Sequence, residues 1–145
     1  MTCHHPLSFT MDADARRLLV VRCWANAVFS ELIPGASDED RHAFVLAVHE
    51  AAQNVIEHGY EGAHGSIHFE AAPHGSSLSV VLTHDGRPFS GEASEPCFDG
   101  GSDRGFGLFL MRRAVSRVDH RTTPTGRQQI ELIKHIPEDP QGHRH

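Results

Sequence analysis

The sequence predicts an α/β (α+β) sandwich, in which a mixed, mainly antiparallel sheet is covered by helices on one face. Segments with the alternating apolar pattern of strands outnumber segments with helical spacing. Most of the strand segments also occur in pairs connected by short turns that contain proline and glycine, as hairpins do. Amphipathic helices bury their apolar stripes against one face of such a sheet.

Two segments have the apolar spacing of amphipathic helices. The first covers residues 13–32, with Asp12 or Asp14 as its N-cap. The second is capped by Ser37 or Asp38 and includes the helical run 44–60. The predicted buried stripes are Leu18, Val21, Trp24, Ala25 and Val28 in the first helix, and Phe44, Val48, Ala51 and Val55 in the second.

Alternating apolar residues predict the strands, and proline-glycine segments predict their turns. Pro73-His74-Gly75 and Pro124-Thr125-Gly126 are the expected hairpin turns. We expect one domain over residues 1–137 and a frayed polar tail over residues 138–145. The predicted strands are residues 7–10, 66–72, 77–83, 118–122 and 128–136.

Composition limits the classes of function. The 145 residues carry a net charge of −6, with 13 basic against 19 acidic residues, which argues against direct nucleic-acid binding. The 3 cysteines are odd in number and widely spaced, which favours a reducing compartment. Neither a long apolar run nor a signal-peptide pattern is found, so we expect no membrane association and a cytoplasmic location.

Glu50 and Asn54 are the first candidate site residues. They lie four residues apart in the helical run 44–60, so they stack one turn apart on one face, and His58 continues that line. A carboxylate and a carboxamide placed in this way can hold a divalent metal and orient a water or hydroxyl group. Taken alone, such a pair is more often a solvated helix face.

A glycine-rich segment, GGSDRGFGLFLMRR, supplies the second candidate. Gly105 and Gly107 precede a predicted helix that includes Leu108 and runs to Val118. Unpaired N–H groups at such a helix start bind anions, and Arg104 adds a positive charge. The segment lacks the G-K-[ST] of a Walker A loop. Taken alone, Gly105-Phe106-Gly107 is more often a tight turn before a helix.

The order of these motifs resembles the GHKL ATPases, and specifically the anti-sigma factor serine kinases of bacterial partner-switching systems. EAAQNVIEHGY is similar to the family's N box, HDGRPF to its first glycine box, and GGSDRGFGLFLMRR to its second. The resemblance covers about Leu7 to Ile136 and implies a Bergerat-type ATP-binding fold. A histidine-kinase catalytic domain is the less expected alternative, because no phosphoacceptor histidine helix precedes the N box.

The resemblance also implies roles for individual residues. Glu50 matches the catalytic base that takes a proton from a serine hydroxyl, and Asn54 matches the residue that holds Mg²⁺ against the phosphates of ATP. Residues 90–103 match the lid over the nucleotide. The remaining implied nucleotide contacts are His84, Asp85, Gly86, Arg104, Gly105, Phe106, Gly107 and Leu108. The implied partners are a sigma factor and an anti-sigma factor antagonist, and the implied assembly is a homodimer.

One position departs from the family pattern. The first glycine box begins with an aspartate that accepts the adenine amino group, and Gly86 and Phe89 place that aspartate at His84. A hydrogen bond to a charged group contributes roughly 1.5–3 kcal/mol, so its loss would weaken binding roughly tenfold to a hundredfold. Three alternatives follow: Asp85 replaces His84 through a bulge, His84 serves weakly, or nucleotide binding is reduced or lost. The other matching residues favour retained binding.

Two functions are therefore expected from the sequence. The first is an ATP-dependent protein serine kinase that acts as an anti-sigma factor and phosphorylates a serine on its antagonist. The alternative is a degenerate module that binds nucleotide weakly or not at all and acts by sequestering a sigma factor or an antagonist.

Overall fold

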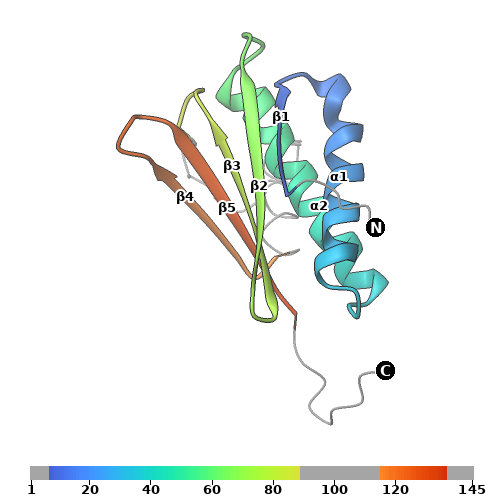
Figure 1. Ribbon diagram of the computed structural model, residues 1–145. Coiled ribbons are helices and arrows are strands. Elements are labelled where there is room, and N and C mark those ends of the chain that lie inside the picture. Colours follow the sequence, from blue (N-terminus) through green and yellow to red (C-terminus); the bar gives the residue numbers. More distant parts are fainter. Residues whose placement is uncertain (1–6, 89–114, 137–145) are drawn as a thin grey trace, which may run out of the picture.

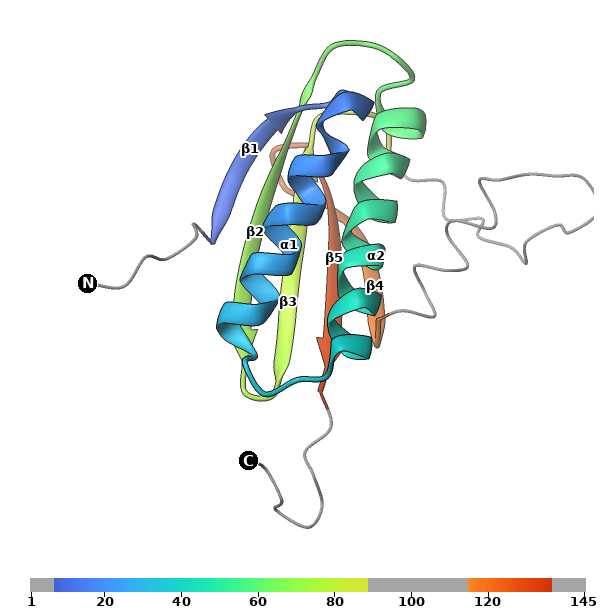
Figure 2. The ribbon, with the colours of Figure 1, turned by 90° about the vertical axis from the view of Figure 1, so that its right-hand side faces the viewer.

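The protein forms two layers, a sheet and a pair of helices. The computed structural model describes residues 7–88 and 115–136. Within this part, the sheet has five strands in the order β1-β2-β3-β5-β4, and all neighbouring strands pair antiparallel. Helices α1 and α2 lie side by side on one face of the sheet (Figures 1 and 2). The elements are β1 (Ser8–Asp12), η1 (Ala15–Arg17), α1 (Leu18–Leu32), α2 (Asp38–Asn54), η2 (Val55–Gly59), β2 (Ser66–His74), β3 (Ser77–His84), β4 (Arg117–Thr122) and β5 (Gln128–His135).

The predicted fold class is confirmed, although no parallel pair occurs among the described strands. Both predicted hairpins are present, as β2 with β3 and β4 with β5. Strand β5 lies between β3 and β4. The second hairpin therefore pairs with the first through β5, which is the later of its two strands in the chain. The predicted edge strand 7–10 is shifted, because β1 covers Ser8–Asp12 and pairs with β2 over its whole length.

Helix α1 begins later than the sequence predicts. The Asp14 side chain accepts a hydrogen bond from the backbone N–H of Arg16 at 2.9 Å and caps the 3₁₀ turn η1. The α-helix then runs from Leu18, so the expected start at Ala13 is wrong. A 3₁₀ turn at a helix start is common, because it satisfies N–H groups that lack a partner within the helix. The predicted buried stripe of α1 is confirmed, since all five of its residues are buried.

Helix α2 begins as expected. The Ser37 hydroxyl accepts a hydrogen bond from the N–H of Asp40 at 3.0 Å, which makes Ser37 the N-cap. Asp38, Glu39 and Asp40 follow in the first turn, where carboxylates interact favourably with the helix dipole. These local interactions fix where α2 starts and thereby set the position of the polar residues near its end.

The core lies between the helices and the facing side of the sheet. It includes a cluster of three rings, in which Phe9 of β1 stacks on Phe69 of β2 with 4.6 Å between ring centroids, and Trp24 of α1 lies 5.0 and 5.7 Å from them. Burying aromatic rings of this size supplies much of the stabilisation of a small domain. This cluster holds α1 over the β1–β2 edge of the sheet.

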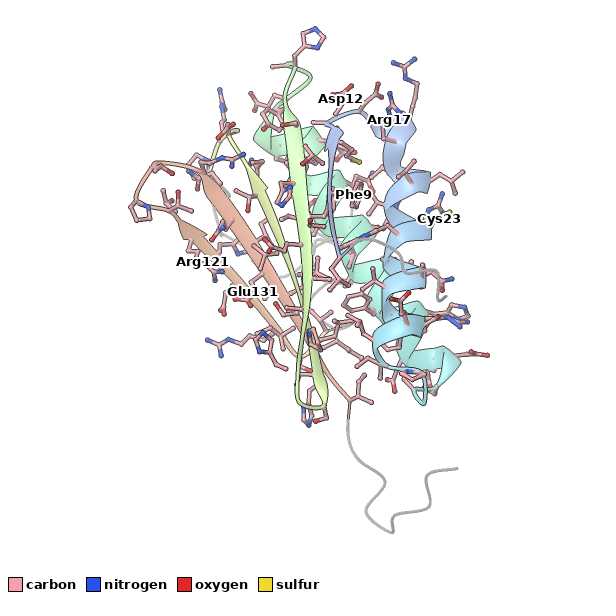
Figure 3. All side chains as sticks on the ribbon, viewed as in Figure 1. Phe9, Asp12, Arg17, Cys23, Arg121 and Glu131 are labelled. Atoms are coloured by element: carbon pink, nitrogen blue, oxygen red, sulfur yellow. The ribbon has the colours of Figure 1, made fainter. Side chains whose placement is uncertain are left out.

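The opposite face of the sheet is polar. Glu131 accepts hydrogen bonds from Ser79 at 2.8 Å and from Arg121 at 3.0 Å. Arg121 also donates to the amide oxygen of Gln129 at 3.0 Å, and the Gln129 amide donates to Thr83 at 3.2 Å. Figure 3 shows Arg121 and Glu131 on β4 and β5, away from the helices. This network satisfies Ser79 and Thr83, which are buried although helices cover only the other face.

The helix that the sequence predicts after Gly107 extends too far. Val115 and Ser116 form a bend, and β4 begins at Arg117, so Val118 belongs to the strand that is also predicted over residues 118–122. Its apolar side chain lies on the helix-facing side of β4, next to Leu132 of β5. The tail 138–145 lies outside the described residues. Within the described ranges, each helix falls short of the length or the apolar character that a membrane span requires.

Candidate functional site

Glu50 and Asn54 both lie in the second half of α2. Their four-residue spacing within an α-helix places them one turn apart on the same face, as the sequence predicts. Asn54 is buried with 8% of its surface exposed, whereas Glu50 is half-buried. The arrangement therefore combines the carboxylate of Glu50, which is near solvent, with the buried amide of Asn54. These groups suit proton acceptance and metal coordination, respectively.

His58, which the sequence predicts in line with Glu50 and Asn54, lies beyond the end of the α-helix. The α-helix ends at Asn54, and Val55–Gly59 form the π-helical turn η2, in which the N–H of Tyr60 donates to the carbonyl of Val55 at 3.0 Å. Single π turns of this kind occur frequently at functional sites.

The π turn ends against the loop that follows β3. The N–H of Arg87 donates a hydrogen bond to the carbonyl of Gly59 at 2.7 Å, which ties the end of η2 directly to this loop. We call this contact region the η2–β3 junction. It consists of Gly59, Tyr60, His84, Asp85, Gly86 and Arg87.

Tyr60 is the side chain that joins the parts of the junction. Its hydroxyl donates to the carbonyl of Ser66 at 2.7 Å and accepts from the N–H of Asp85 at 2.9 Å. It therefore links the start of β2 to the end of β3. Its ring meets the ring of His84 edge-on, with 5.8 Å between centroids. No pattern in the sequence predicts a role for Tyr60, and the one signal it carries there is that it is the single tyrosine of the chain.

Gly86 is required at its position by a close approach of two backbones. A Cβ atom at position 86 would lie 2.5 Å from the carbonyl oxygen and 2.7 Å from the carbonyl carbon of Gly59. Gly59 is also tightly packed, because a Cβ there would lie 3.2 Å from Cε1 of His84. Glycines at both positions let the loop and the π turn come into backbone contact.

His84 occupies the buried position at the end of β3. Its side chain faces the helix layer, in the same row as Ile67 of β2 and Gln128 of β5, and only 2% of the residue is exposed. Its Nδ1 atom accepts a hydrogen bond from the N–H of Gly86 at 3.0 Å. Burial lowers the pKa of the imidazole below its ordinary value of 6.5, against the opposite effect of Asp85. The ring is therefore neutral at pH 7.

Asp85 points the other way, as strand alternation predicts. Its side chain is 64% exposed and pairs with Nε of Arg127 at 2.8 Å. The pairing of β3 with both neighbours is regular through His84, so the described strands contain no bulge that would exchange Asp85 for His84. His84, and not Asp85, thus presents its side chain on the helix-facing side. Which of them contacts a ligand stays a prediction.

The buried histidine predicts how stability depends on pH. Since the pKa of His84 is lower in the folded than in the unfolded chain, stability is retained above pH 6.5 and falls as pH decreases from 6.5 towards the folded pKa. A single group of this kind contributes at most about 1.4 kcal/mol per pH unit. Urea unfolding at pH 7.5 and 5.5 should show a smaller loss for His84→Asn than for the wild type.

Asparagine is the informative replacement, because its amide oxygen can still accept from Gly86 but does not titrate. Burial also lowers the pKa of His49, so part of the acid sensitivity should persist in the variant. Exposed His64 provides the control, and His64→Asn should leave the pH dependence unchanged. Equal acid sensitivity in the wild type and His84→Asn would contradict the prediction.

The remaining predicted site residues lie outside the described ranges. They are Arg104, Gly105, Phe106, Gly107 and Leu108, together with the predicted lid 90–103. The structure brings together the end of α2 and the end of β3, which supply two of the three motifs found in the sequence. The arrangement offers three groups near one end of the helix layer: the carboxylate of Glu50 as a proton acceptor, the buried amide of Asn54 and the buried imidazole of His84.

Comparisons with known proteins identify the fold and the family. The family model for the histidine kinase-like ATPase domain matches residues 11–134. Among curated proteins, none matches the chain. The histidine kinase domain of the Erythrobacter litoralis EL346 blue-light activated histidine kinase has a similar fold, with a TM-score of 0.53 and 16% identity over 82% of this chain and 60% of that chain.

A second structure of that blue-light activated histidine kinase gives a TM-score of 0.52 and 19% identity, over 70% of this chain and 32% of that chain. This chain therefore spans less than two thirds of either structure, and at these identities the likeness concerns the fold. The family match covers most of the chain, including Glu50, Asn54 and the η2–β3 junction. The chain belongs to the histidine kinase-like ATPase domain family.

Proposed function

We propose that this protein is an anti-sigma factor with protein serine kinase activity. It uses a magnesium-bound purine nucleoside triphosphate, which is ATP in the proteins it resembles, to phosphorylate a serine on an anti-sigma factor antagonist. In this proposal it acts in the cytoplasm as a homodimer and binds a sigma factor. The observation that supports the proposal best is the placement of Glu50 and Asn54 beside a junction that joins the helix end to the β3 loop.

The donor set of α2 fits a magnesium site. An amide oxygen is a hard ligand of the kind that Mg²⁺ accepts, and the burial of Asn54 restricts the positions that its side chain can adopt. Glu50, one turn earlier and closer to solvent, can accept the proton of an incoming serine hydroxyl. Phosphoryl transfer depends mainly on positioning and on charge stabilisation. A helix that ends in a fixed junction provides such positioning.

The proposed role of the second glycine box rests on the sequence alone. Backbone N–H groups at Gly105 and Gly107 would cradle the phosphates, and Arg104 would add a positive charge beside them. In the transfer itself, the serine oxygen bonds to the terminal phosphorus, the bond to the bridging oxygen breaks, and Glu50 holds the proton. The nucleoside diphosphate is released.

Calorimetric titration of magnesium nucleotides into the purified protein tests the proposal. We expect the wild type to bind at least one of ATP, GTP and ITP with a Kd on the order of micromolar. Asn54→Ala should weaken binding roughly tenfold to a hundredfold, because a contact to a charged group is lost. Gln53→Ala is the matched control, since that amide is engaged with Glu57 at 2.9 Å. Absence of binding by all three nucleotides would refute the kinase proposal.

His84 favours a second candidate function, in which the chain sequesters a sigma factor or an antagonist without transferring phosphate. The resemblance to the GHKL ATPases implies a carboxylate at this position, whereas His84 is a neutral imidazole and lacks the charge that would accept an adenine amino group. This candidate predicts that partner binding is the same with and without magnesium nucleotide. Partner binding that requires nucleotide, measured by co-elution on a sizing column, would exclude it.

A further inference from the structure

The hydrogen bond to His84 determines which ring nitrogen carries the proton. The donor is the backbone N–H of Gly86, whose hydrogen is always present, and it points at Nδ1 from 3.0 Å. An imidazole nitrogen that accepts a hydrogen bond carries no proton. Since a neutral imidazole has one N–H group, that group must be on Nε2. The side chain at position 84 is therefore a hydrogen-bond donor.

The surroundings hold the ring in this state. Cε1 and Nδ1 face the backbone of Gly59, and the Tyr60 ring packs edge-on, so the Nδ1 side of the ring is directed at the junction. Burial lowers the pKa, which disfavours the doubly protonated ring. The charged or titratable groups that act on it are Asp85, Arg127 and His120, and the last two also disfavour the cation. A flip of the ring would leave the N–H of Gly86 without its acceptor.

We propose that His84 selects nucleotides with an oxygen at position 6 of the purine, guanine or hypoxanthine, over adenine nucleotides. The inference rests on the proposed nucleotide site, in which position 84 faces the exocyclic group of the base. Adenine presents an amino group there, which is a donor, whereas guanine and hypoxanthine present the acceptor O6. A fixed Nε2–H donor pairs with O6 and opposes an amino group.

The expected discrimination is substantial because His84 is buried, with 2% of its surface exposed. An amino group against a buried N–H leaves two donors unsatisfied, and sites that are built around a specific hydrogen bond discriminate strongly against ligands that lack it. To accept a hydrogen bond from Nε2–H of His84, adenine would have to shift in the site so that its N1 atom, and not its amino group, lies opposite this donor. We expect a preference of roughly tenfold or more for the 6-oxopurine.

Titration of magnesium diphosphates by calorimetry at pH 7.5 tests this inference without turnover. ADP and IDP are the decisive pair, because they differ at position 6 and in the N1 proton that follows from it. GDP adds an amino group at position 2 and shows whether that group is tolerated. We expect IDP to bind at least about tenfold more tightly than ADP.

Two variants assign any preference to His84. His84→Asp replaces the donor by a carboxylate and should reverse the order, so that ADP binds more tightly than IDP. His84→Asn keeps an acceptor for Gly86 but lacks a group at the place of Nε2, so the preference should largely disappear. Circular dichroism and thermal unfolding confirm that each variant is folded before it is titrated.

The outcomes separate this inference from the proposed function. Tighter binding of ADP than of IDP by the wild type would overturn the inference and leave the nucleotide site intact. A preference for IDP that persists in His84→Asn would also overturn it, because the selectivity would then come from another residue. Absence of binding by all three diphosphates would overturn the proposed function and the inference together.

Discussion

Replacing Glu50 with glutamine is expected to slow phosphoryl transfer roughly 10²–10⁴-fold, the usual contribution of a general base. The amide has nearly the same shape as the carboxylate but cannot take up a proton. Because Glu50 lies one turn before Asn54 and is not the proposed metal ligand, the affinity for magnesium nucleotide should change little. Phosphate release from the triphosphate, with water in place of serine, measures the effect without a protein partner.

Glu57→Gln is the matched control for this prediction. Glu57 is exposed, lies in η2 and loses the same charge when it becomes glutamine. It should retain the rate of the wild type. A Glu50→Gln protein that released phosphate at the original rate would show that the role assigned to Glu50 is wrong.

Replacing Gly86 with alanine should damage stability and nucleotide binding together. The new Cβ would lie 2.5 Å from the carbonyl oxygen of Gly59, and this oxygen belongs to the backbone and cannot rotate away. Overpacking of this kind costs typically about 1–3 kcal/mol. The hydrogen bonds from Arg87 to Gly59 and from Gly86 to His84 should lengthen as the loop moves. Urea unfolding and nucleotide titration measure the two effects.

Gly35→Ala separates this close contact from the general cost of replacing a glycine. No atom lies within 4 Å of a Cβ at position 35, and Gly35 is not among the glycines with positive φ. Its replacement should leave stability and nucleotide binding nearly unchanged. Equal effects of the two substitutions would mean that the backbone contact at Gly86 contributes neither to stability nor to nucleotide binding.

Part of the site was predictable because it depends on short-range geometry. Helical spacing alone places Glu50 above Asn54, and both residues do lie in the α-helical part of α2. Strand alternation likewise separates His84 from Asp85, and the structure buries the first and exposes the second. The π turn was not predictable, since it depends on how the end of α2 meets the β3 loop. Without that contact, the pattern 44–60 reads as a continuous helix.

The layers of this protein follow from the apolar pattern of its sequence. The stripe of α1, the two hairpins and the Ser37 cap follow from interactions between residues close in the chain. Tertiary contacts set three further features: the position of β5 between β3 and β4, the bridge made by the Tyr60 hydroxyl, and the position of the proton on His84. Each of these depends on partners distant in the chain or on the conformation of a loop, and the local sequence pattern carries no information about such contacts.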